Sequence, residues 1–281
     1  MKVWQPLQTH VAFQGERGAY SEEAIVSFFG EAVNAVPCKT IREVFKNTEA
    51  RVVDYGVVPV ENSIEGSVAE TYDMFLNSSV KVSGEIILRI RHCLISLPET
   101  SLGDVKVVYS HPQALAQCRG FLTSLGVETV VTYDTAGSVK MIKEKGLKEA
   151  AAVASERAAA LYGMKVLAKG VEDYGHNYTR FLVISAKEAP RQPESKTSII
   201  FSTAHKPGAL YNALGAFARN DINLTKIESR PTRQRPWEYY FFVDFEGHQD
   251  DERVRKALVE LASFTTFVKV LGSYPRAHTE P

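Results

Sequence analysis

The sequence has no hydrophobic stretch long enough to cross a membrane. None of its apolar runs approaches the roughly 18 residues that a transmembrane helix needs. A secretory signal would also need an unbroken apolar segment near the N-terminus, where this chain carries Gln5, Pro6, Gln8 and Thr9. We therefore expect a cytoplasmic protein with no membrane partner.

Cysteine is scarce, and several signatures of cofactor sites are missing. Cys38, Cys93 and Cys118 are far apart and form no CxxC pair, so neither a disulfide framework nor a thiolate metal site is expected. The seven histidines show no HxxxH spacing, which disfavours a zinc hydrolase. No GxGxxG follows a predicted strand, which disfavours a nicotinamide dehydrogenase.

The chain also lacks an excess of charge of either sign. Its 33 Lys and Arg residues balance 33 Asp and Glu residues, so no basic field favours nucleic acid. Hydrophobic residues make up 44% and charged residues 23% of the 281 residues, which are values of a globular protein. That length accommodates two domains.

The first half of the sequence alternates short apolar runs with helical patterns. Strands are expected at residues 10–13, 55–60, 105–109, 127–133 and 150–154. Helix starts are expected at Ser21, at the Thr40 and Glu43 capping box, at Pro112, near Ser138 and after Ser155. This alternation predicts an α/β fold with a mostly parallel sheet covered on both faces.

A linker is expected at residues 187–196, because this segment holds two prolines and no large apolar residue. We therefore assign residues 1–186 and 197–281 to separate domains. The second has strands at 197–202, 222–228, 238–245 and 265–271 and helices at 207–219 and 251–261. The order βαββαβ predicts a ferredoxin-like fold.

Four polar segments follow or begin predicted strands, where open α/β sheets bind ligands. They cover residues 14–18, 61–63, 110–113 and 177–181. Taken singly, each segment is compatible with an ordinary tight loop or helix cap as well as with a ligand-binding site. In the last segment, strand alternation places Thr179 and Phe181 on one face and Arg180 on the other.

Taken together, four segments of the chain resemble, in order and spacing, the signature segments of prephenate dehydratases. They are GERGAYS, GVVPVENSIEG, SHPQALAQC and NYTRF. GAL at residues 208–210 and ESRP at residues 228–231 resemble the phenylalanine-binding segments of the ACT domain that follows in this family. The resemblance implies two α/β lobes around a cleft, like those of a periplasmic binding protein. It also implies the conversion of prephenate to phenylpyruvate, water and carbon dioxide without a metal or organic cofactor.

The resemblance marks Thr179 as the catalytic residue. We expect Ser110 and Gln113 to hold one substrate carboxylate, Asn62 and Ser63 to hold the other, and Phe181 to exclude water. Two roles stay open. Glu61 either supplies a proton or holds the neighbouring loop, and Arg180 either clamps a carboxylate or forms an internal ion pair.

The C-terminal domain is expected to sense L-phenylalanine, with feedback inhibition as the hypothesis. The predicted effector residues are Gly208, Ala209, Leu210, Asn223, Leu224, Glu228, Ser229 and Arg230. A ferredoxin-like unit leaves one face of its sheet uncovered, so a homo-oligomer, a dimer or tetramer joined through the ACT domains, is expected.

Two alternatives remain. Arogenate dehydratase acts on a substrate with an amino group where prephenate has a keto group. A small-molecule binding protein without catalysis would share the two-lobed architecture, since a fold does not determine a function. Only about ten residues precede the first dehydratase segment, so we expect no chorismate mutase activity.

Overall fold

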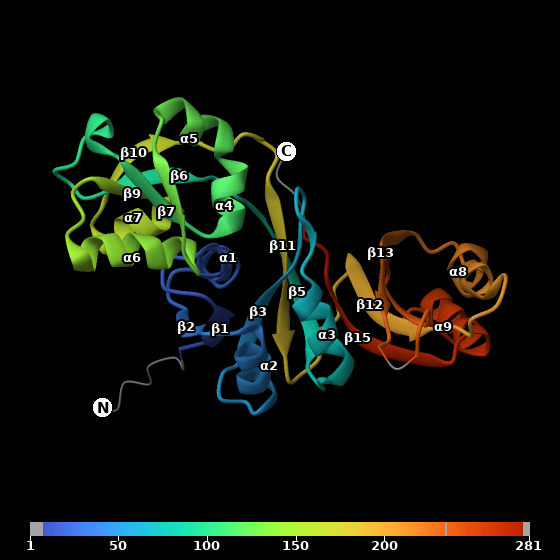
Figure 1. The fold of residues 1–281 in the computed structure, drawn as a ribbon. Helices are drawn as coiled ribbons and strands as arrows, with labels where there is room; N and C mark the ends of the chain where they lie inside the picture. The colour runs from blue at the N-terminus through green and yellow to red at the C-terminus, as the bar shows by residue number, and fades with distance from the viewer. Residues whose placement is uncertain (1–7, 234, 278–281) are drawn as a thin grey trace, which may run out of the picture. The chain divides into compact units, whose positions relative to one another are not determined.

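The fold consists of three β-sheets with helices packed on them (Figure 1). The computed structural model describes residues 8–233 and 235–277. Most of the N-terminal segment from which we predicted the location of the protein lies outside these residues. Within the described residues, no helix has the length and apolarity needed to span a membrane.

The first sheet has six strands, in the order β2-β1-β3-β11-β5 with β4 paired to β3, and β1 runs parallel to β2 and β3. Its strands are β1 (His10–Gln14), β2 (Asn34–Cys38), β3 (Tyr55–Asn62), β4 (Gly66–Ser67), β5 (Lys81–Arg89) and β11 (Tyr178–Ser185). Helices α1 (Tyr20–Phe29) and α2 (Ile41–Glu49) pack on β1 and β3.

The second sheet has the order β10-β6-β9-β7-β8. Its strands are β6 (Cys93–Ser96), β7 (Val107–Ser110), β8 (Glu128–Val131), β9 (Ala150–Ala154) and β10 (Lys165–Lys169). The neighbouring helical elements are η1 (Leu102–Asp104), α4 (Pro112–Gln117), α5 (Arg119–Leu125), α6 (Thr135–Lys145) and α7 (Glu156–Tyr162). Strand β7 is parallel to β8 and β9, but β6 and β10 pair antiparallel, so this sheet is mixed rather than mostly parallel.

Local sequence explains most helix ends. Thr40 caps α2 by accepting a hydrogen bond from the Glu43 backbone N–H, as predicted. Gly126 ends α5 in the left-handed conformation that glycine favours. Ser21 is not an N-cap, because α1 already begins at Tyr20 and Ser21 lies buried within its first turn.

The C-terminal sheet is antiparallel, in the order β13-β14-β12-β15, and confirms the predicted βαββαβ unit. Its elements are β12 (Ser195–Ser202), α8 (Ala209–Arg219), β13 (Leu224–Pro231), β14 (Tyr239–Glu246), α9 (Glu252–Phe264) and β15 (Phe267–Pro275). Side chains of α8 and α9 form one buried core with Ile199, Phe201, Val243 and Phe245. The two-lobed α/β architecture followed by a ferredoxin-like domain is thus confirmed.

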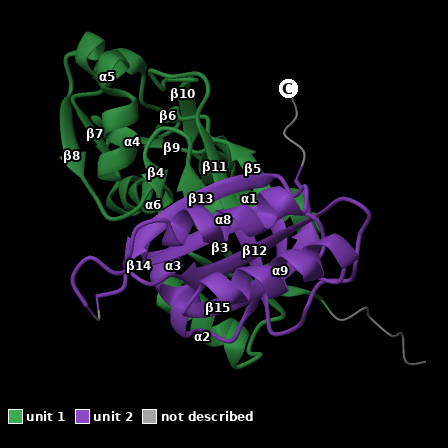
Figure 2. Cartoon of the chain, turned by 90° about the vertical axis from the view of Figure 1, so that its right-hand side faces the viewer, with its two compact units in different colours: residues 1–68, 86–181 green, residues 69–85, 182–281 purple. Residues whose placement is uncertain are grey.

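The chain forms two compact units whose boundary differs from a single cut at the linker (Figure 2). Unit 1 comprises residues 1–68 and 86–181, and unit 2 comprises residues 69–85 and 182–281. Helix α3 (Ala69–Asn77) and the first half of β5 therefore belong to the same unit as the C-terminal sheet. The sequence did not predict this, because α3 precedes that sheet by more than 100 residues.

Within unit 2, α3 packs on the face of the C-terminal sheet that α8 and α9 leave free. Tyr72 stacks edge-on against Phe242, and Lys269 Nζ donates to three carbonyl oxygens near the C-terminal end of α3. The buried carboxylate of Glu85 accepts a hydrogen bond from Lys196 Nζ at 2.7 Å. The sheet face that we expected to be open for self-association therefore has an occupant from the same chain.

Candidate functional site

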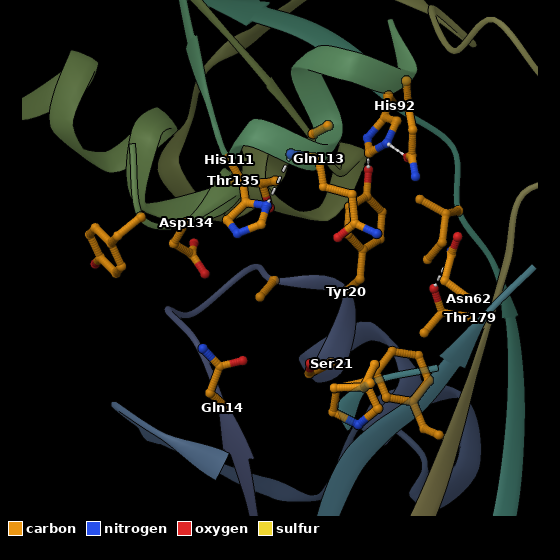
Figure 3. A pocket seen from close by; sticks show the side chains of 18 of the residues that line it. Gln14, Tyr20, Ser21, Asn62, His92, His111, Gln113, Asp134, Thr135 and Thr179 are labelled. Atoms are coloured by element: carbon orange, nitrogen blue, oxygen red, sulfur yellow. Dashed lines mark hydrogen bonds between the residues drawn. The ribbon is translucent and has the colours of Figure 1, made fainter. Parts of the chain in front are cut away.

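A cavity of about 340 Å³ opens in unit 1 between elements of its two sheets (Figure 3). Residues on β1, α1, α2, β3, α4, α6 and β11 and on the adjoining loops line it. They are Gln14, Ala19, Tyr20, Ser21, Ile41, Pro59, Asn62, Val68, Ile90, His92, His111, Gln113, Ala114, Gln117, Tyr133, Asp134, Thr135, Thr179 and Phe181. The volume suits a small organic molecule.

Four of the described helices begin at this cavity, and α2 is one of them because its first residue, Ile41, lines it. The lining also includes Tyr20 at the start of α1, His111 before α4, and Thr135 at the start of α6. The N–H groups and the dipole at a helix N-terminus favour negative charge. No Lys or Arg occurs among the described residues that line the cavity. An anionic ligand there would be bound by neutral donors and helix N-termini.

Thr179 lies on β11 with its hydroxyl oxygen facing Asn62. Asn62 Nδ2 donates to Thr179 Oγ1 at 3.0 Å (Figure 3). Because an amide N–H can only donate, the threonine oxygen is the acceptor, and its own hydrogen is free to point into the cavity. Phe181 lines the same cavity and Arg180 does not, which confirms the predicted alternation along this strand.

A chain of side-chain hydrogen bonds extends from Asn62 through the protein. Asn62 Nδ2 donates to Asn177 Oδ1 at 2.8 Å, and Asn177 Nδ2 donates to Gln117 Oε1 at 2.8 Å. His92 Nε2 lies 2.9 Å from the same Gln117 oxygen, and His92 Nδ1 lies 2.8 Å from the Tyr20 hydroxyl. Six side chains, counting Thr179, thus form one network.

Four of the eight residues predicted for the catalytic and substrate site line the cavity, namely Asn62, Gln113, Thr179 and Phe181. The lining residues do not include the other four, Glu61, Ser63, Ser110 and Arg180. Ser110 is fully buried, and its hydroxyl donates to the Val153 carbonyl at 2.6 Å, which leaves no hydrogen for a substrate carboxylate. Ser63 donates to the His176 carbonyl and accepts from the Tyr178 N–H, so it fastens its loop to β11.

Glu61 and Arg180 are likewise not among the lining residues. Glu61 pairs with Ser67 in the β3–β4 ladder, next to Asn62, and neighbouring strand residues face opposite sides. The direct roles in proton supply and carboxylate binding therefore find no support in this geometry. The structural roles that we considered for both residues stay predictions.

Several residues that line the cavity were not predicted from the sequence. Gln117 follows Gln113 by four residues and lies on the same helical face, a spacing that could have revealed it. Tyr20, His92 and Asp134 carry no comparable local signal. Asp134 caps α6 by accepting from the Gly137 N–H at 2.7 Å, and burial raises the pKa of its carboxyl group.

His92 gives the folded protein a specific pH dependence. Burial lowers the pKa of its imidazole, although the Gln117 hydrogen bond and the nearby Glu172 act in the opposite direction. An unfolded histidine titrates near pH ~6.5, so below that pH the unfolded chain binds more protons than the folded chain. The free energy of unfolding should fall as the pH decreases through this value towards the lower folded pKa.

Replacing His92 with Gln should remove this contribution. Urea unfolding of both proteins between about pH 5 and pH 7 should show a shallower fall in the free energy of unfolding for His92→Gln. The other six histidines are common to both proteins, so the difference reports on His92. Equal slopes would contradict a neutral, buried imidazole.

One hollow described in unit 2 contains part of the predicted effector set. Ala209 and Leu210 line this hollow of about 150 Å³, together with residues 203–206, 237–239 and 241. The residues lining it do not include the other predicted effector residues, which are Gly208, Asn223, Leu224, Glu228, Ser229 and Arg230. Arg230 instead pairs with Asp73 of α3 at 3.4 Å.

Comparison with known proteins agrees with this arrangement. The family model for prephenate dehydratase matches residues 11–189, and that for the ACT domain matches residues 197–263. A bifunctional chorismate mutase/prephenate dehydratase of Aquifex aeolicus is 48% identical over 95% of this chain and 74% of its own length. Arogenate dehydratase/prephenate dehydratase 2 of Arabidopsis thaliana, a chloroplastic protein, is 44% identical over 95% of this chain and 73% of its own length.

Among solved structures, prephenate dehydratase from Arthrobacter aurescens in complex with L-Phe superposes with a TM-score of 0.88. Its sequence identity is 31%, and the alignment covers 97% of this chain and 92% of that one. The family model, the relatives and the fold agree over nearly the whole chain. The chain therefore belongs to the prephenate dehydratase family of lyases and carries a C-terminal ACT domain.

Proposed function

We propose that this enzyme converts prephenate to phenylpyruvate, water and carbon dioxide. The observation that carries the proposal is the position of Thr179. It lines a cavity where four of the described helices begin, and its hydroxyl oxygen accepts a hydrogen bond from Asn62. Prephenate brings two carboxylates and a ring hydroxyl to such a cavity. Helix N-termini suit the carboxylates, and a hydroxyl donor suits the departing group.

The reaction needs no redox partner. As the bond between the ring and its carboxylate breaks, the electron pair enters the ring, and the carbon–oxygen bond on the opposite side of the ring breaks. The departing hydroxide takes a proton, which is supplied in the net reaction by the solvent, and leaves as water, and the ring becomes aromatic. We propose that the Thr179 hydroxyl donates its hydrogen bond to this oxygen, where negative charge develops in the transition state.

Phe181 and the neighbouring apolar lining suit the decarboxylation. Phe181 is 2% exposed and lines the cavity beside Val68 and Ile90. An apolar wall withholds water from the carboxylate that is lost, and a carboxylate decarboxylates more readily when poorly solvated. The polar and apolar parts of the cavity thus support different steps of one reaction.

Arogenate is the second candidate substrate, and Asp134 is the observation that favours it. The ionised carboxyl group of Asp134 would attract the ammonium group of arogenate. In its protonated form the same group tolerates the keto acid prephenate, and burial favours that form. A binding protein without catalysis is disfavoured by the family to which the chain belongs.

The purified full chain should be assayed with prephenate and with arogenate in parallel. We expect phenylpyruvate from prephenate at a higher kcat/KM than phenylalanine from arogenate. Asp134→Asn should lower the activity towards arogenate more than towards prephenate. A preference for arogenate would reassign the substrate, and no turnover of either by folded protein would overturn the proposal.

We further propose that L-phenylalanine binds the ACT domain and inhibits the enzyme. Arg230 of the ESRP segment pairs with Asp73, and α3 begins directly after Val68, which lines the catalytic cavity. A ligand that changes the contacts of Arg230 would therefore act on a helix joined by the chain to the cavity. Such coupling typically amounts to about 1–3 kcal/mol.

Phenylalanine should bind in a calorimetric titration and raise the KM for prephenate or lower kcat. Asp73→Asn should weaken the inhibition by up to about tenfold while phenylalanine still binds, since the pair to Arg230 is lost. Lys106→Met, in an exposed pair, is the matched control. Binding without any change in kinetics would contradict the regulatory role.

An oligomer and a cytoplasmic location complete the proposal. Strand β13 is an edge of the C-terminal sheet, and its Ile227 is 47% exposed, which favours pairing with a second copy. Such pairing through the ACT domains could unite the two effector segments. Sedimentation of the purified chain as a monomer would contradict it. Cell fractionation tests the cytoplasmic location.

A further inference from the structure

The hydrogen-bond chain behind Thr179 has a direction, which Asn62 sets. The oxygen of an amide side chain only accepts and its nitrogen only donates. Asn62 Oδ1 accepts from the backbone N–H groups of Ile64 and Glu65, both at 3.0 Å. Since backbone donors cannot be reversed, Nδ2 of Asn62 must face Thr179 and Asn177.

The direction passes from one amide to the next. Asn177 must present its oxygen to Asn62 Nδ2, so its nitrogen faces Gln117. Gln117 must then present its oxygen to Asn177, and the same oxygen faces His92 Nε2 at 2.9 Å. An acceptor at that position requires a proton on His92 Nε2. His92 Nδ1 is then left to accept from the Tyr20 hydroxyl at 2.8 Å, in place of the Arg91 carbonyl that lies 3.0 Å from the same hydroxyl.

We infer that His92 is held as the neutral Nε2–H tautomer and acts as a positioning residue that fixes the orientation of Gln117. With Oε1 occupied by two donors, the Gln117 amino group faces the cavity that this residue lines. The cavity thus receives two neutral donors from one network, Gln117 Nε2–H and the Thr179 hydroxyl. The benefit to an anionic substrate rests on the proposed function, whereas the tautomer does not.

The opposite direction would leave buried groups mismatched. A proton on Nδ1 alone would place the lone pair of Nε2 against the Gln117 oxygen, unless Gln117 and then Asn177 were rotated. Rotated Asn177 would face Asn62 nitrogen to nitrogen. Each such mismatch leaves a buried donor or acceptor without a partner, which destabilises the folded chain. Asn177 is fully buried and His92 is 2% exposed, so water does not relieve it.

Nitrogen-15 NMR of histidine-labelled protein tests the tautomer directly. The His92 signal is identified as the one missing from His92→Gln. Near pH 7, it should show a protonated Nε2 and an unprotonated Nδ1. A protonated Nδ1 with an unprotonated Nε2 in the folded wild-type chain would overturn the inference, whether or not the protein turns over prephenate.

Two variants that exchange an amide for a carboxylate predict opposite spectra. Asn177→Asp replaces the donor to Gln117 with an acceptor, so Gln117 should rotate and the His92 proton should move to Nδ1. The Tyr20 hydroxyl can then donate to the Arg91 carbonyl, which lies 3.0 Å away. Gln117→Glu retains the acceptor, so Nε2 should stay protonated. If Asn177→Asp folds with Nε2 still protonated and its own carboxyl ionised, the inference fails. If it does not fold, the wild-type and Gln117→Glu spectra decide.

Kinetics tests the positioning role. His92→Gln places an amide N–H near the position of Nε2, whereas His92→Leu fills space without a donor. We expect kcat/KM for prephenate to fall about tenfold in His92→Leu and less than about threefold in His92→Gln, since a hydrogen bond of about 1.4 kcal/mol is lost only in the former. Equal losses would show that His92 only fills space. An inactive wild-type chain with the expected spectrum would count against the proposed function alone.

Discussion

Thr179→Val should lower kcat for prephenate by about 10²- to 10⁴-fold and change KM little. Valine has the same shape but no hydroxyl, so the variant loses the donor to the departing oxygen. That interaction strengthens only as the carbon–oxygen bond breaks, and a loss of this kind appears in kcat rather than in KM. Steady-state kinetics of phenylpyruvate formation measures both parameters.

Thr179→Ser is the matched control for this prediction. Serine keeps the hydroxyl that accepts from Asn62 Nδ2, so it should retain most of the activity that valine loses. Thermal unfolding should show similar stability for both variants. A Thr179→Val enzyme with near-normal kcat would remove Thr179 from the mechanism, even if prephenate remained the substrate.

Lys196→Met should lower the free energy of unfolding by about 3–5 kcal/mol. The side chains of Lys196 and Glu85 are 10% and 1% exposed, and their charged atoms lie 2.7 Å apart. Removing the ammonium leaves a buried carboxylate without that cation, and the loss of one partner of a buried pair is strongly destabilising. The expected cause is electrostatic, because methionine preserves most of the volume.

The double variant Glu85→Gln/Lys196→Met should recover a large part of this loss, since no buried charge remains. Lys106→Met is the control, because Lys106 and Glu149 are both more than 60% exposed and such pairs contribute about 0–1 kcal/mol. Denaturant unfolding of the four proteins gives the comparison. Equal effects of Lys196→Met and Lys106→Met would contradict the importance of this pair within unit 2.

The sequence predicted the elements whose signals are local. Thr40, Gly126 and the βαββαβ order are set by neighbours in the chain, and the structure agrees with each. The association of α3 with the C-terminal sheet was not predictable in this way. It depends on contacts such as that of Tyr72 with Phe242, which lie far apart in the sequence.

The same contrast applies to the site. Strand periodicity placed Thr179 and Phe181 on one face, and both line the cavity. Periodicity could not show that the Ser110 hydroxyl is already used by the Val153 carbonyl. Nor could it link Asn62, Gln117 and His92, because the direction of their hydrogen bonds depends on which atoms meet in the folded chain.

Prephenate labelled with carbon-13 at both carboxyl groups tests the proposed reaction most directly, because the fate of each carboxyl carbon can be followed. The purified chain should release the ring carboxylate as carbon dioxide and keep the other label in phenylpyruvate, in equal amounts. Thr179→Val should do neither at an appreciable rate. Retention of both labels, or unchanged release by Thr179→Val, would contradict the proposed mechanism.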